Sequence, residues 1–95
     1  MLALDRGHRT VVAEKTTFHV FAIRAALDPQ VMLRVAGLFA QRHLVPRQLI
    51  CRATESALLI DVEIDLEEPR VAQILLEKIR SIVLVDRVNL VEDKI

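Results

Sequence analysis

The chain has 95 residues, 53% of them apolar, and its 13 basic and 13 acidic side chains give a formal net charge of zero. This length predicts one small domain, and the apolar content excludes a disordered chain. Zero net charge and only three aromatic residues argue against nucleic acid as a partner, and one cysteine excludes a disulfide framework. Because we find neither a signal peptide nor an apolar run near the ~20 residues of a membrane span, we expect a cytoplasmic protein with no membrane partner.

The first half of the chain predicts a lead-in, a strand and a helix. Residues 1–16 have mixed charge and little periodicity, which predicts a flexible lead-in. The β-branched and aromatic stretch Thr17–Ala25 predicts a central strand, because both of its faces are partly apolar. Asp28 and Pro29 then form a helix start, with the Asp as cap. The helix is expected to end near Arg42, and its apolar positions are Val31, Met32, Val35, Ala36, Leu38 and Phe39.

The second half predicts a hairpin, a helix and a strand. Arg47–Thr54 and Ala57–Asp65 alternate apolar and polar residues on either side of a two-residue turn, as the strands of a hairpin do. Glu68 and Pro69 repeat the acid–proline helix start, and Val71, Ile74, Leu75 and Ile79 form the apolar stripe of a helix that reaches about Ile82. A last strand is expected at Val83–Val91, followed by a tail at residues 92–95.

This order of elements predicts an α+β, ferredoxin-like βαββαβ domain over residues 17–91. Its four-stranded antiparallel sheet would carry both helices on one face and leave the other face uncovered. Strand parity puts apolar and charged side chains together on the uncovered face, which is either a contact surface or an ordinary mixed surface. We take the second strand as a sheet edge, and the predicted contact residues are Gln48, Ile50, Arg52, Val20 and Leu59.

The sequence contains no arrangement of residues typical of an active site. The three histidines lack the spacing of a helical metal site, and His19 is interpreted as a strand residue near a sheet edge or the core boundary. Cys51 alternates with apolar neighbours, which is typical of a small core residue. We therefore expect no catalytic residue, no metal and no cofactor in this chain.

The turn at Ala26–Val31, which we call the effector turn, is the one place where geometry alone suggests a ligand. The first amides of a helix bind anions such as a carboxylate. Asp28 would compete for the same amides, and a self-capped helix is the favoured interpretation of this turn.

Leu27–Phe39, with its RVAGLF stretch, resembles the first helix of the ACT domain, and in particular that of acetolactate synthase small subunits. Glu68–Val91 is similar to the short form of these subunits. The resemblance implies a split βαβ fold, homodimers joined at sheet edges, and a regulatory subunit that activates a thiamine-diphosphate-dependent catalytic subunit in branched-chain amino-acid biosynthesis. The alternative is a free-standing homodimeric sensor of a small amino acid.

The resemblance also implies an effector site at Leu27, Asp28, Gln30 and Val31. Effector-responsive members typically have Asn-x-Pro-Gly at these positions, whereas this chain has Leu27 and Gln30 in place of the Asn and Gly. Gln30 adds a side chain where a glycine would let a carboxylate approach the backbone. After the helix, His43 and Val45 replace the family's frequent Gly and Asn. We therefore expect weak or absent valine binding.

Overall fold

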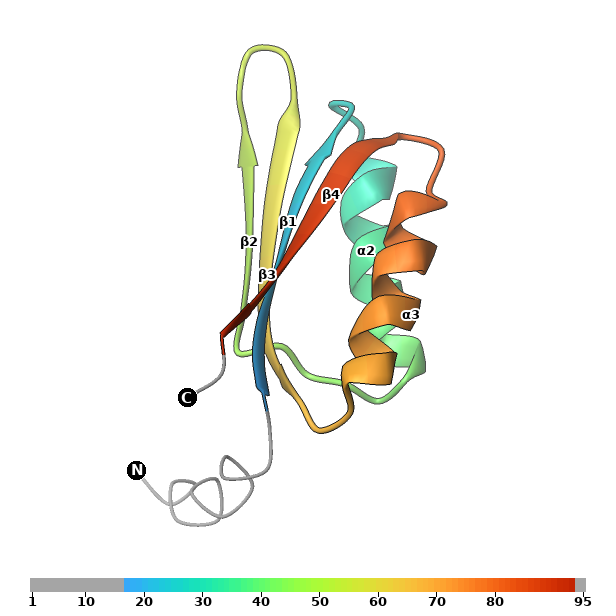
Figure 1. The fold of residues 1–95 in the computed structure, drawn as a ribbon. Helices are drawn as coiled ribbons and strands as arrows, with labels where there is room; N and C mark the ends of the chain where they lie inside the picture. The colour runs from blue at the N-terminus through green and yellow to red at the C-terminus, as the bar shows by residue number, and fades with distance from the viewer. Residues whose placement is uncertain (1–16, 94–95) are drawn as a thin grey trace, which may run out of the picture.

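The computed structural model describes residues 17–93, which form a four-stranded sheet with two helices on one face (Figure 1). The strands lie in the order β2-β3-β1-β4, and every neighbouring pair is antiparallel. This is the predicted ferredoxin-like βαββαβ fold. The predicted lead-in at 1–16 and residues 94–95 of the predicted tail lie outside the described residues. The elements are β1 (Thr17–Ala25), α2 (Pro29–Gln41), β2 (Gln48–Ala53), β3 (Leu58–Leu66), α3 (Pro69–Arg80) and β4 (Val85–Asp93).

β1 is a central strand, as its two partly apolar faces predict. It pairs with β3 along its whole length and with β4 on its other side. Phe21 and Ala25 are fully buried on the helix side, whereas Val20 and Ala22 are half-buried on the other side. His19 is also fully buried in this strand. Of its two predicted places, the sheet edge is wrong, because β1 lies between β3 and β4.

The two helices begin at the predicted prolines, but their caps differ. The Asp28 carboxylate accepts a hydrogen bond of 2.8 Å from the Gln30 N–H, which makes α2 self-capped. Glu68 has the same extended backbone before α3, yet its side chain makes no capping hydrogen bond. The longer Glu side chain is the poorer cap, because Asp, Asn and Ser place their oxygen closer to the first amides.

The end of α2 is closed by a residue in the left-handed conformation. His43 has φ 59°, and its N–H donates to the carbonyl of Ala40 at 3.0 Å. The N–H of Leu44 donates to the carbonyl of Phe39 at 2.9 Å. These two bonds are those of a Schellman motif, which is built most often on glycine. The helix thus ends at Gln41, one residue before the predicted Arg42.

Turn hydrogen bonds explain the other shifted boundaries. The Thr54 backbone N–H and hydroxyl both donate to the carbonyl of Ala57, which places Thr54 in the hairpin turn rather than in β2. The Val85 N–H donates to the carbonyl of Ile82, so the turn after α3 occupies the first two residues of the predicted last strand. β4 therefore begins at Val85 and ends at Asp93, two residues beyond the predicted end at Val91.

The core lies between the sheet and a narrow stripe of each helix. α2 buries Val31, Val35 and Phe39 at i, i+4 spacing, and the Phe39 ring meets Phe21 edge-on with centroids 5.7 Å apart. Met32 and Ala36 are exposed, although they are among the apolar positions of this helix. α3 buries Ala72, Leu75 and Ile79, with Val71 and Ile74 half-buried.

β2 is the least covered strand. Leu49 is 39% exposed and Ile50 43%, on opposite faces of the strand. Cys51 is half-buried rather than in the core, and its burial raises the pKa of the thiol above the ordinary value of 9.0. In Figure 1 both helices lie toward the other side of the sheet from β2, and the turn of the β2–β3 hairpin extends past their ends.

Candidate functional site

The sheet face opposite the helices, which we call the open face, is where the predicted contact residues lie. Gln48 pairs with Glu63, which in turn pairs with Val20, so these side chains form one row across three strands. Ile50 lies in the next row, opposite Asp61. Arg52 and Leu59 are paired in the row after that, so the structure brings all five predicted contact residues onto one surface: Gln48, Ile50, Arg52, Val20 and Leu59.

The edge of this surface is available for pairing. β2 contacts β3 on one side and is the end of the sheet on the other. Its exposed residues Gln48, Ile50 and Arg52 flank backbone groups that have no neighbouring strand within residues 17–93. An edge of this kind accepts a further strand through main-chain hydrogen bonds. That this edge joins two copies of the chain stays a prediction.

The effector turn is tight and mostly satisfied by its own atoms. The Ala26 N–H donates to the carbonyl of Leu84, and the Asp28 N–H donates back to the carbonyl of Ala26 at 2.8 Å. The first two amides of α2, those of Gln30 and Val31, are taken by the carboxylate and the carbonyl of Asp28 respectively. The amides that would attract a ligand carboxylate are thus already hydrogen-bonded.

The four predicted effector residues differ in exposure. Leu27 is 50% exposed and Gln30 is exposed, so both side chains reach the surface beside the turn. Val31 is fully buried, and Asp28 is half-buried as the helix cap. Any ligand at this turn would therefore meet the side chains of Leu27 and Gln30, while Val31 would support it only from within the core.

His19 joins the centre of the sheet to the end of β4. Its Nδ1 donates to the carbonyl of Thr17 at 2.8 Å, because a carbonyl can only accept. Its Nε2 lies 3.1 Å from Oε2 of Glu92, whose side chain is partly exposed. The sequence did not reveal this pair, since Glu92 fell in the predicted tail. Knowing that β4 pairs with β1 through Glu92 would have placed the two side chains side by side.

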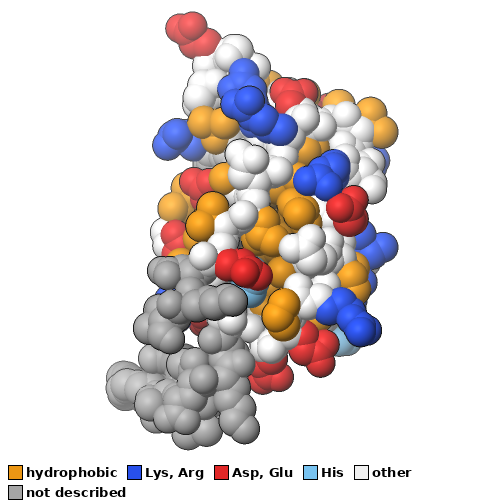
Figure 2. Space-filling view, viewed as in Figure 1, with side chains coloured by type: hydrophobic (Ala, Val, Ile, Leu, Met, Phe, Trp, Pro, Cys, Tyr) orange, Lys and Arg blue, Asp and Glu red, His pale blue; other side chains and the backbone are white. Residues whose placement is uncertain are grey.

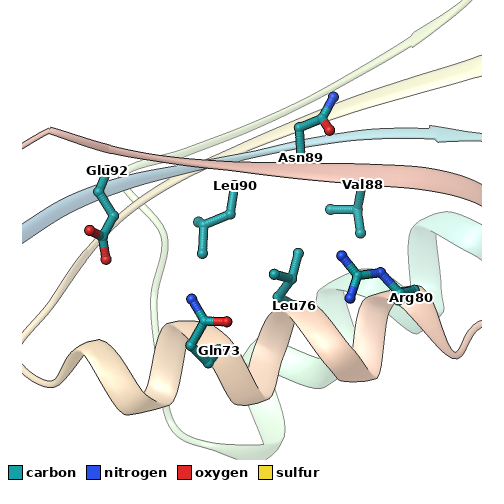
Figure 3. A pocket seen from close by; sticks show the side chains of 7 residues that line it. All are labelled: Gln73, Leu76, Arg80, Val88, Asn89, Leu90 and Glu92. Carbon is teal, nitrogen blue, oxygen red and sulfur yellow. The ribbon is translucent and has the colours of Figure 1, made fainter.

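A second feature that the sequence did not reveal is an open groove of about 400 Å³ between α3 and β4 (Figure 3). Leu76 on the helix and Leu90 on the strand point toward each other, with Glu92 toward one end and Arg80 toward the other. Hydrophobic side chains gather along this part of the surface in Figure 2. The groove exists because α3 covers an edge strand that has no outer neighbour among the described residues.

The described surface offers features that suit binding. Among residues 17–93, no three His, Cys, Asp or Glu side chains are placed to hold a metal ion. The helices of this part of the chain are also too short or too polar to cross a bilayer. What the described surface offers is a sheet edge at each of β2 and β4, a mixed open face and the α3–β4 groove.

Comparison with solved structures shows the same fold in several proteins. The ACT domain of GTP pyrophosphokinase from Chlorobium tepidum superposes with a TM-score of 0.71 at 13% identity, covering 80% of this chain and 99% of that one. An uncharacterised protein from Thermotoga maritima gives 0.70 at 17% identity, with 83% and 99% covered. The C-terminal domain of the MgtC protein from Mycobacterium tuberculosis gives 0.69 at 9% identity, with 85% and 92% covered.

A search of curated proteins gives no match. The family comparison is decisive, because the model of the ACT-like domain matches residues 12–94, nearly the whole chain. ACT domains are generally regulatory, ligand-binding modules. The match agrees with the strand order and with both helices lying on one face. The chain belongs to the ACT-like domain family.

Proposed function

We propose that this chain is a non-catalytic regulatory subunit of an acetolactate-synthase-type enzyme in the cytoplasm. It binds the thiamine-diphosphate-dependent catalytic subunit and raises its activity in branched-chain amino-acid biosynthesis. The observation that carries the proposal is the uncovered side of the sheet, where Ile50 is 43% exposed on a free edge and Val20 and Leu59 lie half-buried behind it. Apolar groups in this position gain by burial against a partner.

In the proposal, a second copy of the chain and the catalytic subunit contact different parts of this surface. The β2 edge pairs with β2 of a second copy and extends the sheet across a homodimer. The open face, which that pairing leaves accessible, takes the catalytic subunit. The RVAGLF stretch of α2, which resembles acetolactate synthase small subunits, supports the choice of that enzyme.

The self-capped effector turn supports activation rather than strong feedback inhibition. An amino-acid ligand would have to displace the Asp28 carboxylate from the Gln30 amide before its own carboxylate could bind there. A charge-assisted bond to a helix amide is worth about 1 kcal/mol as a cap, and two carboxylates at one helix start repel each other. Weak or absent valine binding follows.

The test of activation mixes the purified chain with the catalytic subunit and measures acetolactate formation and elution volume. We expect no activity from the chain alone, a rise in the activity of the catalytic subunit, and one co-eluting complex. The proposal fails if mixing changes neither quantity.

The test of the dimer edge uses Ile50→Lys, with Val83→Lys as its matched control. Val83 is 89% exposed in the turn between α3 and β4, away from the β2 edge, so a lysine there adds the same charge without touching the edge. We expect Ile50→Lys to shift the sedimentation profile toward monomer and Val83→Lys to leave it unchanged. An Ile50→Lys profile identical to that of the unmodified chain removes the edge from the proposal.

The alternative function is a free-standing homodimeric sensor of a small amino acid. The observation in its favour is that Leu27 and Gln30 both expose their side chains beside the effector turn, where a second subunit could close over a ligand. Calorimetric titration with each of the twenty amino acids tests it. A saturable heat with one of them, together with no effect on a catalytic subunit, would favour the sensor over the activator.

A further inference from the structure

We infer that the hairpin end of the open face holds a binding site for a compact, multiply charged anion. The site is an open hollow of about 230 Å³ that spans all four strands, and three of the residues lining it are Arg24, Arg52 and Arg87. We call it the arginine hollow. It is distinct from the effector turn and from the α3–β4 groove. It shares Arg52 and Leu59 with the predicted contact surface, but its test uses the chain alone and does not depend on the proposed function.

The three arginines come together because they share one row of the sheet. Arg52 on β2 pairs with Leu59 on β3, Leu59 pairs with Arg24 on β1, and Arg24 pairs with Arg87 on β4. Paired residues on antiparallel strands project to the same face, so all three guanidinium groups lie on the open face. Basic side chains gather toward this end of the sheet in Figure 2.

The row is electrostatically unfavourable without an anion. Arg24 and Arg87 are direct cross-strand neighbours, and like charges in that position destabilise a sheet. Among the described residues, neither Arg52 nor Arg87 forms an ion pair. Arg24 has Asp86 at 3.8 Å, but this contact exceeds hydrogen-bond distance and both side chains are well exposed, so it neutralises little. The net charge of the chain is zero, yet three arginines lie in this single row of the sheet.

The other walls of the hollow limit what can bind. Leu59 and Ala22 form an apolar floor, and Asp61 is the acid in the lining, one row away from the arginines. The volume equals that of about eight water molecules at ~30 Å³ each, which suits a small anion rather than a protein segment. Guanidinium groups recognise phosphate and carboxylate oxygens through paired hydrogen bonds. The ligand is therefore a small molecule with several closely spaced anionic oxygens, either phosphate-bearing or polycarboxylate.

The test titrates the full chain with inorganic pyrophosphate and, in a separate arm, with citrate, each against sodium chloride of equal ionic strength. Amide shifts in the NMR spectrum report the site. We expect saturable shifts at Arg24, Leu59 and Arg87 with pyrophosphate or citrate and none with chloride. Saturation by pyrophosphate alone identifies a phosphate-bearing ligand, and saturation by citrate alone identifies a polycarboxylate.

Three variants should change the affinity for the anion in three different ways. Arg87→Gln removes one of the three cations and should weaken binding on the order of tenfold, as the loss of a charge-assisted hydrogen bond does. Asp61→Asn removes the opposing charge and should tighten binding. Arg34→Gln is the matched control, because Arg34 is exposed on α2, across the sheet from the open face, and its loss should change nothing. Arg87 is used because Arg52 also belongs to the predicted contact surface.

Thermal melts show that each variant is folded before its binding is compared, and Arg24→Gln replaces Arg87→Gln if the latter does not fold. Chloride shifts equal to those of pyrophosphate, or an equal loss in Arg34→Gln and Arg87→Gln, would show general charge screening and overturn the inference. If neither anion saturates the site, the inference is also overturned, even where an acidic peptide binds instead.

Discussion

Replacing His43 by glycine should stabilise the domain. His43 is exposed and holds the left-handed conformation that closes α2, with φ 59°. The left-handed conformation costs a residue with a Cβ about 1–2 kcal/mol, and glycine adopts it freely. Glycine also has more backbone freedom to lose from the unfolded chain, at about 0.4–1 kcal/mol. The difference is a net gain of about 0.5–1 kcal/mol, or a rise in Tm of roughly 3–6 °C for a domain of this size.

The measurement is a thermal melt followed by circular dichroism, together with urea unfolding. The urea midpoint should rise for His43→Gly while the slope of the free energy against urea stays constant. His43→Ala is the control, because it removes the imidazole but keeps the Cβ and hence the strain. An equal gain in His43→Ala would show that the imidazole, and not the backbone conformation, is the cause. A lower midpoint for His43→Gly would refute the reasoning outright.

Two further predictions concern α2 and β2. Gly37→Ala should raise the free energy of unfolding by about 1 kcal/mol in the same melts, because a Cβ built at Gly37 meets nothing within 4 Å and alanine is the better helix former; a lower Tm would reveal a neighbour that the structure lacks. Burial raises the pKa of the Cys51 thiol, so its stabilising contribution is full below the ordinary thiol pKa and is lost as the pH rises through the folded-state value. The unmodified chain should therefore lose more stability than Cys51→Ala in urea titrations above about pH 9, and parallel pH profiles would contradict this.

The elements that the sequence predicted best are those whose signals are local. β1 has the predicted bounds, and both helices begin at the predicted prolines, because strand patterning and the fixed φ of proline act within a few residues. The predicted ends of the helices and of β4 were less accurate. They depend on turn hydrogen bonds, such as that from Val85 to Ile82, which periodicity does not encode.

Burial was predicted less well than secondary structure, because it depends on which element covers which. Met32 and Ala36 are apolar and lie at helical spacing, yet they are exposed, since α2 turns only Val31, Val35 and Phe39 toward the sheet. The open face could be predicted, as strand parity alone divides the side chains of a sheet into two sets. The arginine hollow could not, because it requires the register that brings Arg87 opposite Arg24.

The central position of β1 also has a kinetic consequence. β1 is the first strand in the sequence, but one of its two neighbours in the sheet is β4, the last strand. His19 and Glu92 therefore meet although they are 73 positions apart in the sequence. The helices and the β2–β3 hairpin can form from neighbouring residues, but the sheet cannot close until a long loop has lost its freedom. Contacts between such distant residues slow folding, so this domain should fold in milliseconds rather than microseconds. Until β4 docks, one side of β1 is an unpaired edge, and that interval is when the chain is most exposed to association with another copy of itself.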